Sequence, residues 1–216
     1  MFVLTGDILK QIAPRLNRAD KIAELLTTIC PQYGINSADI LHEYLANLCE
    51  ESGEFTDYEE NLYYSKPGRL MQVWPHRFLT IDSAIPFIKN PQKLGEFVYG
   101  IRKDLGNTQP GDGWNFRGSG PIQITGRLMF TLFAGYMRKK FGIIKTLNEW
   151  ADLLRNNDEY GIHSASWLFA ISKKLIDEAE ADLMKTIVKK INGGYTNMER
   201  RTVYYTVCKK LIQDQI

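Results

Sequence analysis

The stretch LANLCEESGEFTDYEENLYYS, residues 45–65, joins the end of an amphipathic helix to a polar segment that carries several carboxylates. Ser37 is a suitable N-cap, and the apolar residues after it recur at helical spacing, which predicts one helix ending near Ser52. On this helix Glu51 points toward the apolar side, and we expect Glu50 on the other face to meet water. Burial raises the pKa of a carboxyl group, so the pattern makes Glu51 the candidate general acid.

A second carboxylate for acid–base chemistry is expected from the segment that follows the helix. The candidates there are Glu54, Asp57, Glu59 and Glu60. Composition alone favours a solvated acidic loop, because runs of charge usually form solvated faces. The residues by themselves therefore do not select one of the four.

Three blocks of sequence, in order between residues 45 and 204, resemble the family 19 glycoside hydrolases. These are the chitinases and the phage endolysins related to them. The first block is E-S-G-x-F followed by E-N-L-x-Y-S, and the second is GDGWNFRGSGPIQITG at 111–126. The third is I-N-G-G from Ile191, followed by Arg200-x-x-x-Tyr204.

The resemblance implies roles for individual residues. It gives Glu51 the general-acid position and Glu60 the general-base position, and it assigns Thr125 to holding the attacking water. It also implies that substrate is contacted by Tyr64, Trp114, Gln123, Asn192 and Arg200. Arg200 is further expected to pair with an active-site carboxylate, with a plain surface arginine as the alternative. The sequence departs from the family pattern at Glu50 (commonly His), Ser119 (commonly Arg) and Met129 (commonly Asn).

Composition narrows the class of protein. The 216 residues are 44% hydrophobic and 24% charged, which predicts a folded protein with a substantial core. A net charge of +2 suits a polyanionic wall or membrane surface and is too small to predict nucleic-acid binding. The sequence contains no run of about 18 apolar residues, so no membrane span is predicted. The start, MFVLTGDILKQ, lacks the features of a conventional signal peptide.

No metal or cofactor is predicted. The histidines His42, His76 and His163 lack metal-ligand spacing, and so do the three cysteines. Cys30, Cys49 and Cys208 are odd in number and far apart, so we expect buried free thiols of a protein made in a reducing cytoplasm.

The rest of the chain predicts further helices with two irregular stretches between them. Helices are expected over 5–30, with Thr5 as the first cap and a break at Pro14, from Asn90-Pro91 to Tyr99, from the capping box at Thr146, and over 159–172 and 181–191. Asn197 is expected to cap a last helix, whose buried stripe comprises Tyr204, Val207, Cys208 and Leu211. Residues 103–120 form a long Gly-rich loop of the kind that is usually functional. A phosphate-binding loop is excluded because no Gly-Lys-Ser/Thr follows. Residues 121–125 alternate like a strand, with Ile122 and Ile124 turned inward.

Trp74, in the basic segment 66–78, has two interpretations. A flat aromatic ring among cations could line a groove for a sugar or wall polymer. A half-buried structural tryptophan fits the same pattern.

Together these observations predict a mainly helical, lysozyme-like α+β fold in two lobes, forming a single catalytic domain over 1–216 without a separate wall-binding module. Small β or irregular portions are expected near 55–65 and 120–125. A cleft between the lobes should carry Glu51 on one side, with Glu60 and Thr125 on the other. The resemblance implies hydrolysis of β-1,4 bonds between N-acetylated amino sugars with inversion.

Peptidoglycan glycan strands are the expected partner, and the protein is expected to be monomeric. The absence of a disulfide framework and of a signal peptide resembles a phage endolysin more than a secreted chitinase. Such a protein is made in the host cytoplasm and acts on the bacterial cell wall. The alternatives are a chitinase that acts on chitin and a catalytically inactive wall-binding protein of the same fold.

Overall fold

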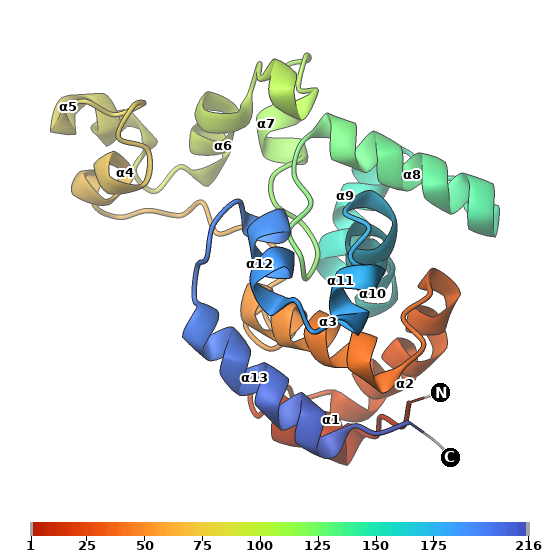
Figure 1. Cartoon of the computed structure of the whole chain (residues 1–216). Coiled ribbons are helices and arrows are strands. Elements are labelled where there is room, and N and C mark those ends of the chain that lie inside the picture. The colour runs from red at the N-terminus through yellow and green to blue at the C-terminus, as the bar shows by residue number, and fades with distance from the viewer. Residues whose placement is uncertain (1, 215–216) are drawn as a thin grey trace. The chain divides into compact units, whose positions relative to one another are not determined.

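The computed structural model describes residues 2–214, and within that range the chain is built almost wholly from helices (Figure 1). It divides into two compact units. The first comprises the described residues 2–58, 120–123 and 153–214, and the second comprises Glu59–Ser119 and Ile124–Asp152. The mainly helical class predicted from the sequence is confirmed.

The first unit contains the helix that ends at Glu51. Its elements are α1 (Gly6–Ile12), α2 (Ala19–Ile29), η1 (Cys30–Tyr33), α3 (Ala38–Glu51), α10 (Asp158–Ser166), the π-helical η4 (Trp167–Ser172), α11 (Ile176–Glu180), α12 (Met184–Asn192) and α13 (Met198–Leu211). The long helix α13 packs along α3 (Figure 1). This packing brings the C-terminal part of the chain against the candidate general acid.

Local signals position α1 and α3 as the sequence predicts. The hydroxyl of Thr5 accepts a hydrogen bond from the amide of Ile8, and Ser37 caps α3 in the same way through Ile40. Helix α3 ends at Glu51, and the amide of Ser52 closes its last turn. The predicted start and end of this helix are confirmed.

A left-handed turn follows α3. Gly53, Glu54 and Phe55 have φ angles of 54°, 64° and 63°, a region that non-glycine residues seldom occupy. The turn is held by the loop between α1 and α2: the amide of Arg15 donates to Oε2 of Glu54 at 2.6 Å, and the guanidinium of Arg18 donates to the carbonyl of Phe55 at 2.8 Å. The Phe55 side chain is fully buried. Packing and hydrogen bonds therefore offset the backbone strain.

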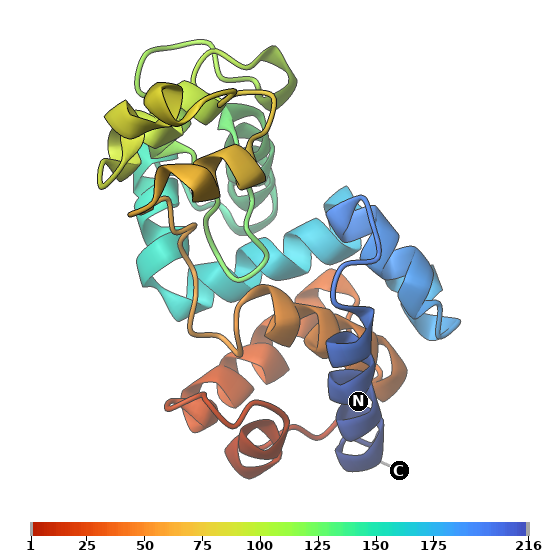
Figure 2. The same ribbon diagram turned by 90° about the vertical axis from the view of Figure 1, so that its left-hand side faces the viewer.

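The second unit contains shorter helices around an aromatic core. Its elements are α4 (Pro67–Val73), α5 (Ile81–Ala84), η2 (Ile85–Phe87), α6 (Pro91–Tyr99), η3 (Lys103–Leu105), α7 (Asp112–Asn115), α8 (Arg127–Phe141) and the first part of α9 (Leu147–Asn156). Helices α4 and α5 lie beside each other at one end of this unit (Figures 1 and 2). The core beneath them comprises Leu62, Leu70, Phe78, Ala84, Phe87, Leu94 and Val98.

Several expectations need correction. Among residues 2–214 the only β-structure consists of three isolated bridges, two of which join Ser119 to Glu59 and to Ile124. Ile122 and Ile124 are buried as predicted, but Gln123 has a φ of 57° and lies in a turn, not a strand. The predicted helix 181–191 begins at Met184, because the chain turns at Asp182 with a φ of 55°.

Candidate active site

The carboxylate of Glu51 is held by a buried arginine. Arg201, on α13, donates to Oε1 of Glu51, and its side chain is only 2% exposed. The other nitrogen of the guanidinium fork donates to Oδ1 of Asn47 at 2.8 Å, one turn earlier on α3, and Nε donates to the carbonyl of Thr196 at 3.2 Å. Each of the three guanidinium nitrogens thus donates one hydrogen bond, and the group fixes one oxygen of Glu51. Glu51 itself is 20% exposed.

The prediction that Glu50 faces water is wrong. Its side chain is 4% exposed, and its Oε1 accepts a hydrogen bond from the side chain of Asn197 at 2.7 Å. Nε of Arg200 lies 3.1 Å from the other oxygen, Oε2. The start of α13 therefore covers the face of α3 that periodicity assigns to solvent. Asn197 precedes α13 as expected, but its side chain binds Glu50 and does not cap the helix.

Glu54 belongs to the same set of contacts. Its Oε1 accepts a hydrogen bond from the hydroxyl of Tyr204 at 2.9 Å, and its Oε2 accepts from Arg15 in the left-handed turn. Burial, followed by the hydrogen bond to Glu54, raises the pKa of Tyr204 to about 12, so the phenol remains a donor at neutral pH. Glu54 is therefore occupied at both oxygens and is a structural carboxylate.

Glu60 lies in the second unit and is held by neutral donors. The hydroxyl of Tyr99, at the end of α6, donates to Oε1 at 2.7 Å, and the amide of Gly118 donates to Oε2 at 3.1 Å. The backbone of Glu60 pairs with the same residue, since its amide donates to the carbonyl of Gly118 at 2.9 Å. Burial, followed by the nearby charge of Glu60, raises the pKa of Tyr99, so its hydroxyl keeps its proton.

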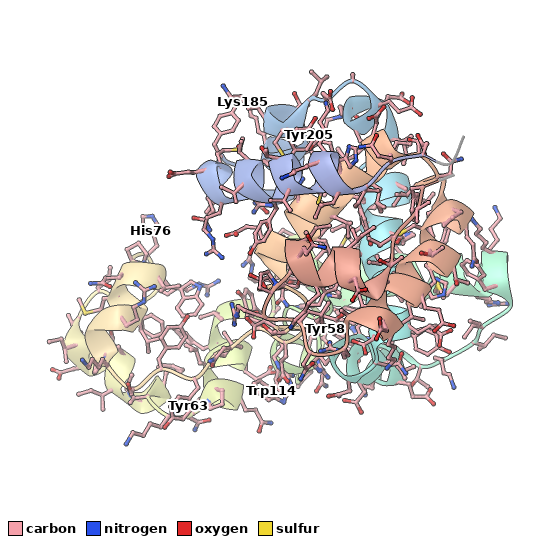
Figure 3. The ribbon with its side chains drawn as sticks, turned by 90° about the horizontal axis from the view of Figure 1, so that it is seen from below. Tyr58, Tyr63, His76, Trp114, Lys185 and Tyr205 are labelled. Atoms are coloured by element: carbon pink, nitrogen blue, oxygen red, sulfur yellow. The ribbon has the colours of Figure 1, made fainter. Side chains whose placement is uncertain are left out.

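The neighbouring Glu59 is locked in an ion pair. Arg117 donates to its Oε1 through Nε at 2.9 Å and also through Nη2. The Arg117 guanidinium lies 3.6 Å from the centroid of the Trp114 ring and donates to the Trp114 carbonyl at 2.6 Å. One face of Trp114, which is labelled in Figure 3, is therefore covered by a cation, and the half-buried ring also packs against the aromatic core of the second unit.

The G-D-G sequence at 111–113 has a structural explanation. Asp112 is buried and accepts hydrogen bonds from the amides of Thr108 and Gln109 and from Arg127. Burial raises the pKa of Asp112, but these hydrogen bonds outweigh it and hold the pKa below its usual value.

Gly113 allows a close approach of two helices. A Cβ atom at this position would lie 2.5 Å from the carbonyl oxygen of Gly95 on α6. The packing of α7 against α6 thus requires glycine here. The Gly-rich stretch 103–120 serves to pack backbone against backbone at this point.

The remaining predicted substrate contacts fall in different surroundings. Tyr64 is half-buried and packs edge-to-face on Trp74, with ring centroids 5.6 Å apart. The Gln123 amide donates to the carbonyl of Gly120 at 3.0 Å, Thr125 is half-buried, and Asn192 is exposed at the end of α12. Trp74 also packs against the aromatic core, which supports its interpretation as a structural residue.

Two departures from the family pattern also have defined places. Ser119 is buried, and its hydroxyl donates to the carbonyl of Arg117 at 2.8 Å. Met129, in the first turn of α8, is half-buried.

Within residues 2–214 no cluster of three or more His, Cys, Asp or Glu side chains could hold a metal ion. Cys30, Cys49 and Cys208 are buried free thiols, as the sequence predicts. No helix in this range is long and apolar enough to cross a membrane.

Comparison with known proteins identifies the family. No family model matches the sequence. A "Glycosyl hydrolase family 19 domain-containing protein" of Haemophilus influenzae is 30% identical over 162 residues, which cover 75% of this chain and 74% of that relative.

The chain belongs to glycosyl hydrolase family 19. The fold agrees with this: chitinase C from Streptomyces griseus HUT6037 superimposes with a TM-score of 0.59 at 13% identity, covering 96% of this chain and 91% of the chitinase. A mutant of chitinase C gives a TM-score of 0.61 at 12% identity with the same coverage. These likenesses show a chitinase-like, lysozyme-like fold, and family 19 membership supports a glycosidase.

Sequence reasoning missed three residues that hold the candidate carboxylates: Arg201, Asn47 and Tyr99. Asn47 stands four residues before Glu51, a spacing that places both on one face of α3 and could have marked it. No local signal separates Arg201 from the adjacent Arg200. Tyr99 lies 39 residues from Glu60, and only the folded chain reveals their contact.

Proposed function

We propose that this protein is an inverting glycosidase that cleaves β-1,4 bonds between N-acetylated amino sugars in the glycan strands of peptidoglycan. The observation that carries the proposal is the pair of family-matched glutamates, each anchored through hydrogen bonds to its own element. Glu51 is held through Oε1 by Arg201, and no hydrogen bond to Oε2 is found among the described residues. That oxygen is available to a leaving group.

In the proposed reaction Glu51 donates a proton to the glycosidic oxygen. Glu60 takes a proton from a water molecule oriented by Thr125, and that water attacks the sugar from the opposite face. The pair of hydrogen bonds on Glu60 leaves lone pairs on both oxygens, as a general base requires. Inversion needs room for the water, so the two carboxyl groups should be roughly 6.5–9.5 Å apart in the substrate complex.

We favour peptidoglycan over chitin as the substrate because the sequence has neither a disulfide framework nor the features of a conventional signal peptide. The thiols are unpaired, as expected for a protein made in a reducing compartment, whereas secreted enzymes often carry disulfides. Both polymers present the same linkage and N-acetyl group, so the same two glutamates serve either one. An inactive wall-binding protein of this fold is the second candidate, favoured by the departures at Ser119 and Met129.

The test is to incubate the purified protein with peptidoglycan and with chitin oligomers and to identify the new reducing-end sugar and its first-formed anomer. We expect cleavage of peptidoglycan with an α-anomeric product. A first-formed β anomer would contradict inversion, and preferential cleavage of chitin would replace the proposed substrate. Glycan binding without cleavage of either polymer would favour the inactive wall-binding protein.

The role of Thr125 has a separate test. Thr125→Val is nearly isosteric, so a space-filling residue should tolerate the change. If the hydroxyl orients the attacking water, turnover should fall about tenfold to a thousandfold while glycan binding persists. Unchanged turnover would remove Thr125 from the mechanism.

A further inference from the structure

Exposed apolar side chains gather around α5 in the second unit. Leu79, Ile81 and Ile85 are 77%, 58% and 53% exposed, and they lie within seven consecutive residues. Scattered single exposed residues need no explanation, but a local group of large aliphatic side chains usually marks an interaction site. The α5 tip, defined as residues 79–85, is such a group.

The exposure of these residues follows from the local structure. Thr80 and Ser83 form a capping box that starts α5, and Ile81 and Ile85 are four residues apart on one face of this turn. The opposite side is anchored, because Phe78 and Ala84 belong to the buried aromatic core. The tip is therefore anchored to the core on one side, and its aliphatic side chains are exposed on the other.

Cations flank the tip and are fixed on aromatic rings. The Arg77 guanidinium lies 5.9 Å from the Phe97 ring centroid and donates to the carbonyl of Phe97 at 3.4 Å. Lys93 Nζ lies 5.2 Å from the centroid of Phe87, and the Phe87 and Phe97 rings are 4.5 Å apart. Lys89 is exposed between them in sequence. The apolar tip is thus bordered by positive charge.

The segment around the tip, residues 66–103, is more positively charged than the chain as a whole. Residues 66–103 contain seven lysines and arginines against two acids, a net charge of +5, whereas the whole chain carries +2. Of the two acids, Glu96 is turned inward and accepts hydrogen bonds from the amides of Gly111 and Trp114. Asp82 is the only exposed acid in this segment. The segment is consequently suited to an anionic partner.

We propose that the α5 tip, with Arg77, Lys89 and Lys93, binds the surface of an anionic lipid bilayer. Aliphatic side chains can enter the boundary between headgroups and acyl chains while flanking cations contact lipid phosphates. A soluble polyanion would use the cations but not the aliphatic residues, and a sugar polymer would favour flat rings over aliphatic side chains. A symmetric dimer through this face would bring two segments of +5 together. A bilayer uses both features at once.

The experiment measures co-sedimentation of the full chain with phosphatidylcholine vesicles, with and without about one third phosphatidylglycerol. Wild type should bind the anionic vesicles, release at high salt and leave neutral vesicles largely unbound. The triple variant Leu79→Ser, Ile81→Ser, Ile85→Ser and the charge variant Lys89→Glu, Lys93→Glu should each weaken the partition coefficient at least about tenfold.

Matched controls come from α8 in the same unit. Leu128→Ser with Leu132→Ser removes exposed leucines elsewhere, and Lys139→Glu with Lys140→Glu reverses two exposed charges. Both controls should bind as wild type, and circular dichroism should report the same helical content for all variants.

Three outcomes overturn the proposal. They are no binding of wild type to anionic vesicles, equal weakening by the controls, and a concentration-dependent dimer that only the triple variant abolishes. The last would assign the tip to a second copy of the chain. Cleavage of soluble oligosaccharides should be the same for wild type and tip variants, so failure of membrane binding is separable from failure of the proposed glycosidase.

Discussion

The two candidate catalytic glutamates are held in opposite ways. Glu51, at the end of a long helix, contacts a buried guanidinium that is itself tied to Asn47. Glu60, on an irregular segment, contacts a phenol and a backbone amide, neither of which carries charge. In the first case a cation holds the carboxyl group in place. In the second the negative charge is stabilised only by dipoles.

Because of this difference, substitutions around the two glutamates should affect stability and turnover to different extents. A buried arginine that loses its partner destabilises a fold strongly, so the surroundings of Glu51 are part of the framework of the first unit. Neutral donors can be removed one at a time at smaller expense in folding free energy. Substitutions near Glu51 should therefore affect both folding and turnover, whereas those near Glu60 should affect turnover more selectively.

The largest effect is expected for Glu51→Gln. The amide keeps an oxygen that can accept from Arg201 but cannot donate an acid proton to the leaving group, so glycan cleavage should fall at least about a thousandfold. Turnover on purified peptidoglycan measures this, and thermal unfolding checks the fold. Asp57→Asn, which changes an exposed acid six residues away, should retain wild-type turnover. Equal losses in both variants would remove Glu51 from its assigned role.

Next in size is the effect of Arg201→Met on stability. The change leaves Glu51 and Asn47 without their partner, and the free energy of unfolding should fall by about 3–5 kcal/mol. The adjacent Arg200 provides a control, because its side chain is 60% exposed and Glu50 keeps its hydrogen bond from Asn197. Arg200→Met should lower the unfolding free energy by less than Arg201→Met does, because Asn197 still donates a hydrogen bond to Glu50. Urea unfolding of the two variants in parallel decides whether the buried contacts of Arg201 contribute more to stability than the exposed contact of Arg200.

A smaller effect, confined to turnover, is expected for Tyr99→Phe. The phenylalanine keeps the ring and removes the hydrogen bond to Glu60, so the carboxylate loses one of the two hydrogen bonds that fix its orientation. Turnover should fall about tenfold to a hundredfold, because a hydrogen bond to a charged group contributes about 1.5–3 kcal/mol. Tyr205→Phe removes a comparable contact, to Asp182 at 2.6 Å, and should leave turnover unchanged. A large drop in stability with normal turnover would make Tyr99 purely structural.

The smallest effect concerns Glu43, which extends the comparison to a carboxyl group that no neighbouring donor holds. Glu43 is fully buried on α3, and neither of its oxygens accepts a hydrogen bond from a described residue. Burial, with a further contribution from Asp182 and an opposing one from Lys209, raises the pKa of Glu43 to about 8 from an ordinary 4.5.

The direction of the pH dependence follows from proton binding. Between pH 4.5 and about 8 the folded state keeps the Glu43 proton and the unfolded state releases it, so stability falls as pH rises through this window. Glu43→Gln has no proton to lose. Its stability relative to wild type should therefore rise as the pH increases from 4.5 to about 8. Denaturation at both pH values measures this, and a pH-independent difference would contradict it.

Sequence reasoning performed best where structure is local. Caps at Thr5 and Ser37, the Asn90-Pro91 start of α6 and the Thr146–Glu149 capping box all form as predicted, because the groups involved are three residues apart. Helix α4 was missed, although Pro67 at its first position is a start signal.

Sequence reasoning was weakest where a distant segment decides a residue's surroundings. Periodicity along α3 placed Glu50 in water, but the start of α13, about 150 residues away, covers it. On α13 the predicted apolar stripe includes Cys208 correctly, while the most buried long side chain is the cationic Arg201, which pattern analysis assigns to a surface. A buried charge is invisible to hydrophobic periodicity, because its position depends on a partner elsewhere in the chain.

The left-handed turn at 53–55 has a consequence for how such enzymes could be recombined. Its two strained non-glycine residues are anchored by Arg15 and Arg18, which lie ahead of α3 in the loop between α1 and α2. The helix α3, which carries Glu51, therefore does not fold independently of the segment that precedes it. In chimeras between relatives, residues 15–55 should be inherited from one parent as a single block, since a crossover inside it would separate the strained turn from the anchors that keep it in place.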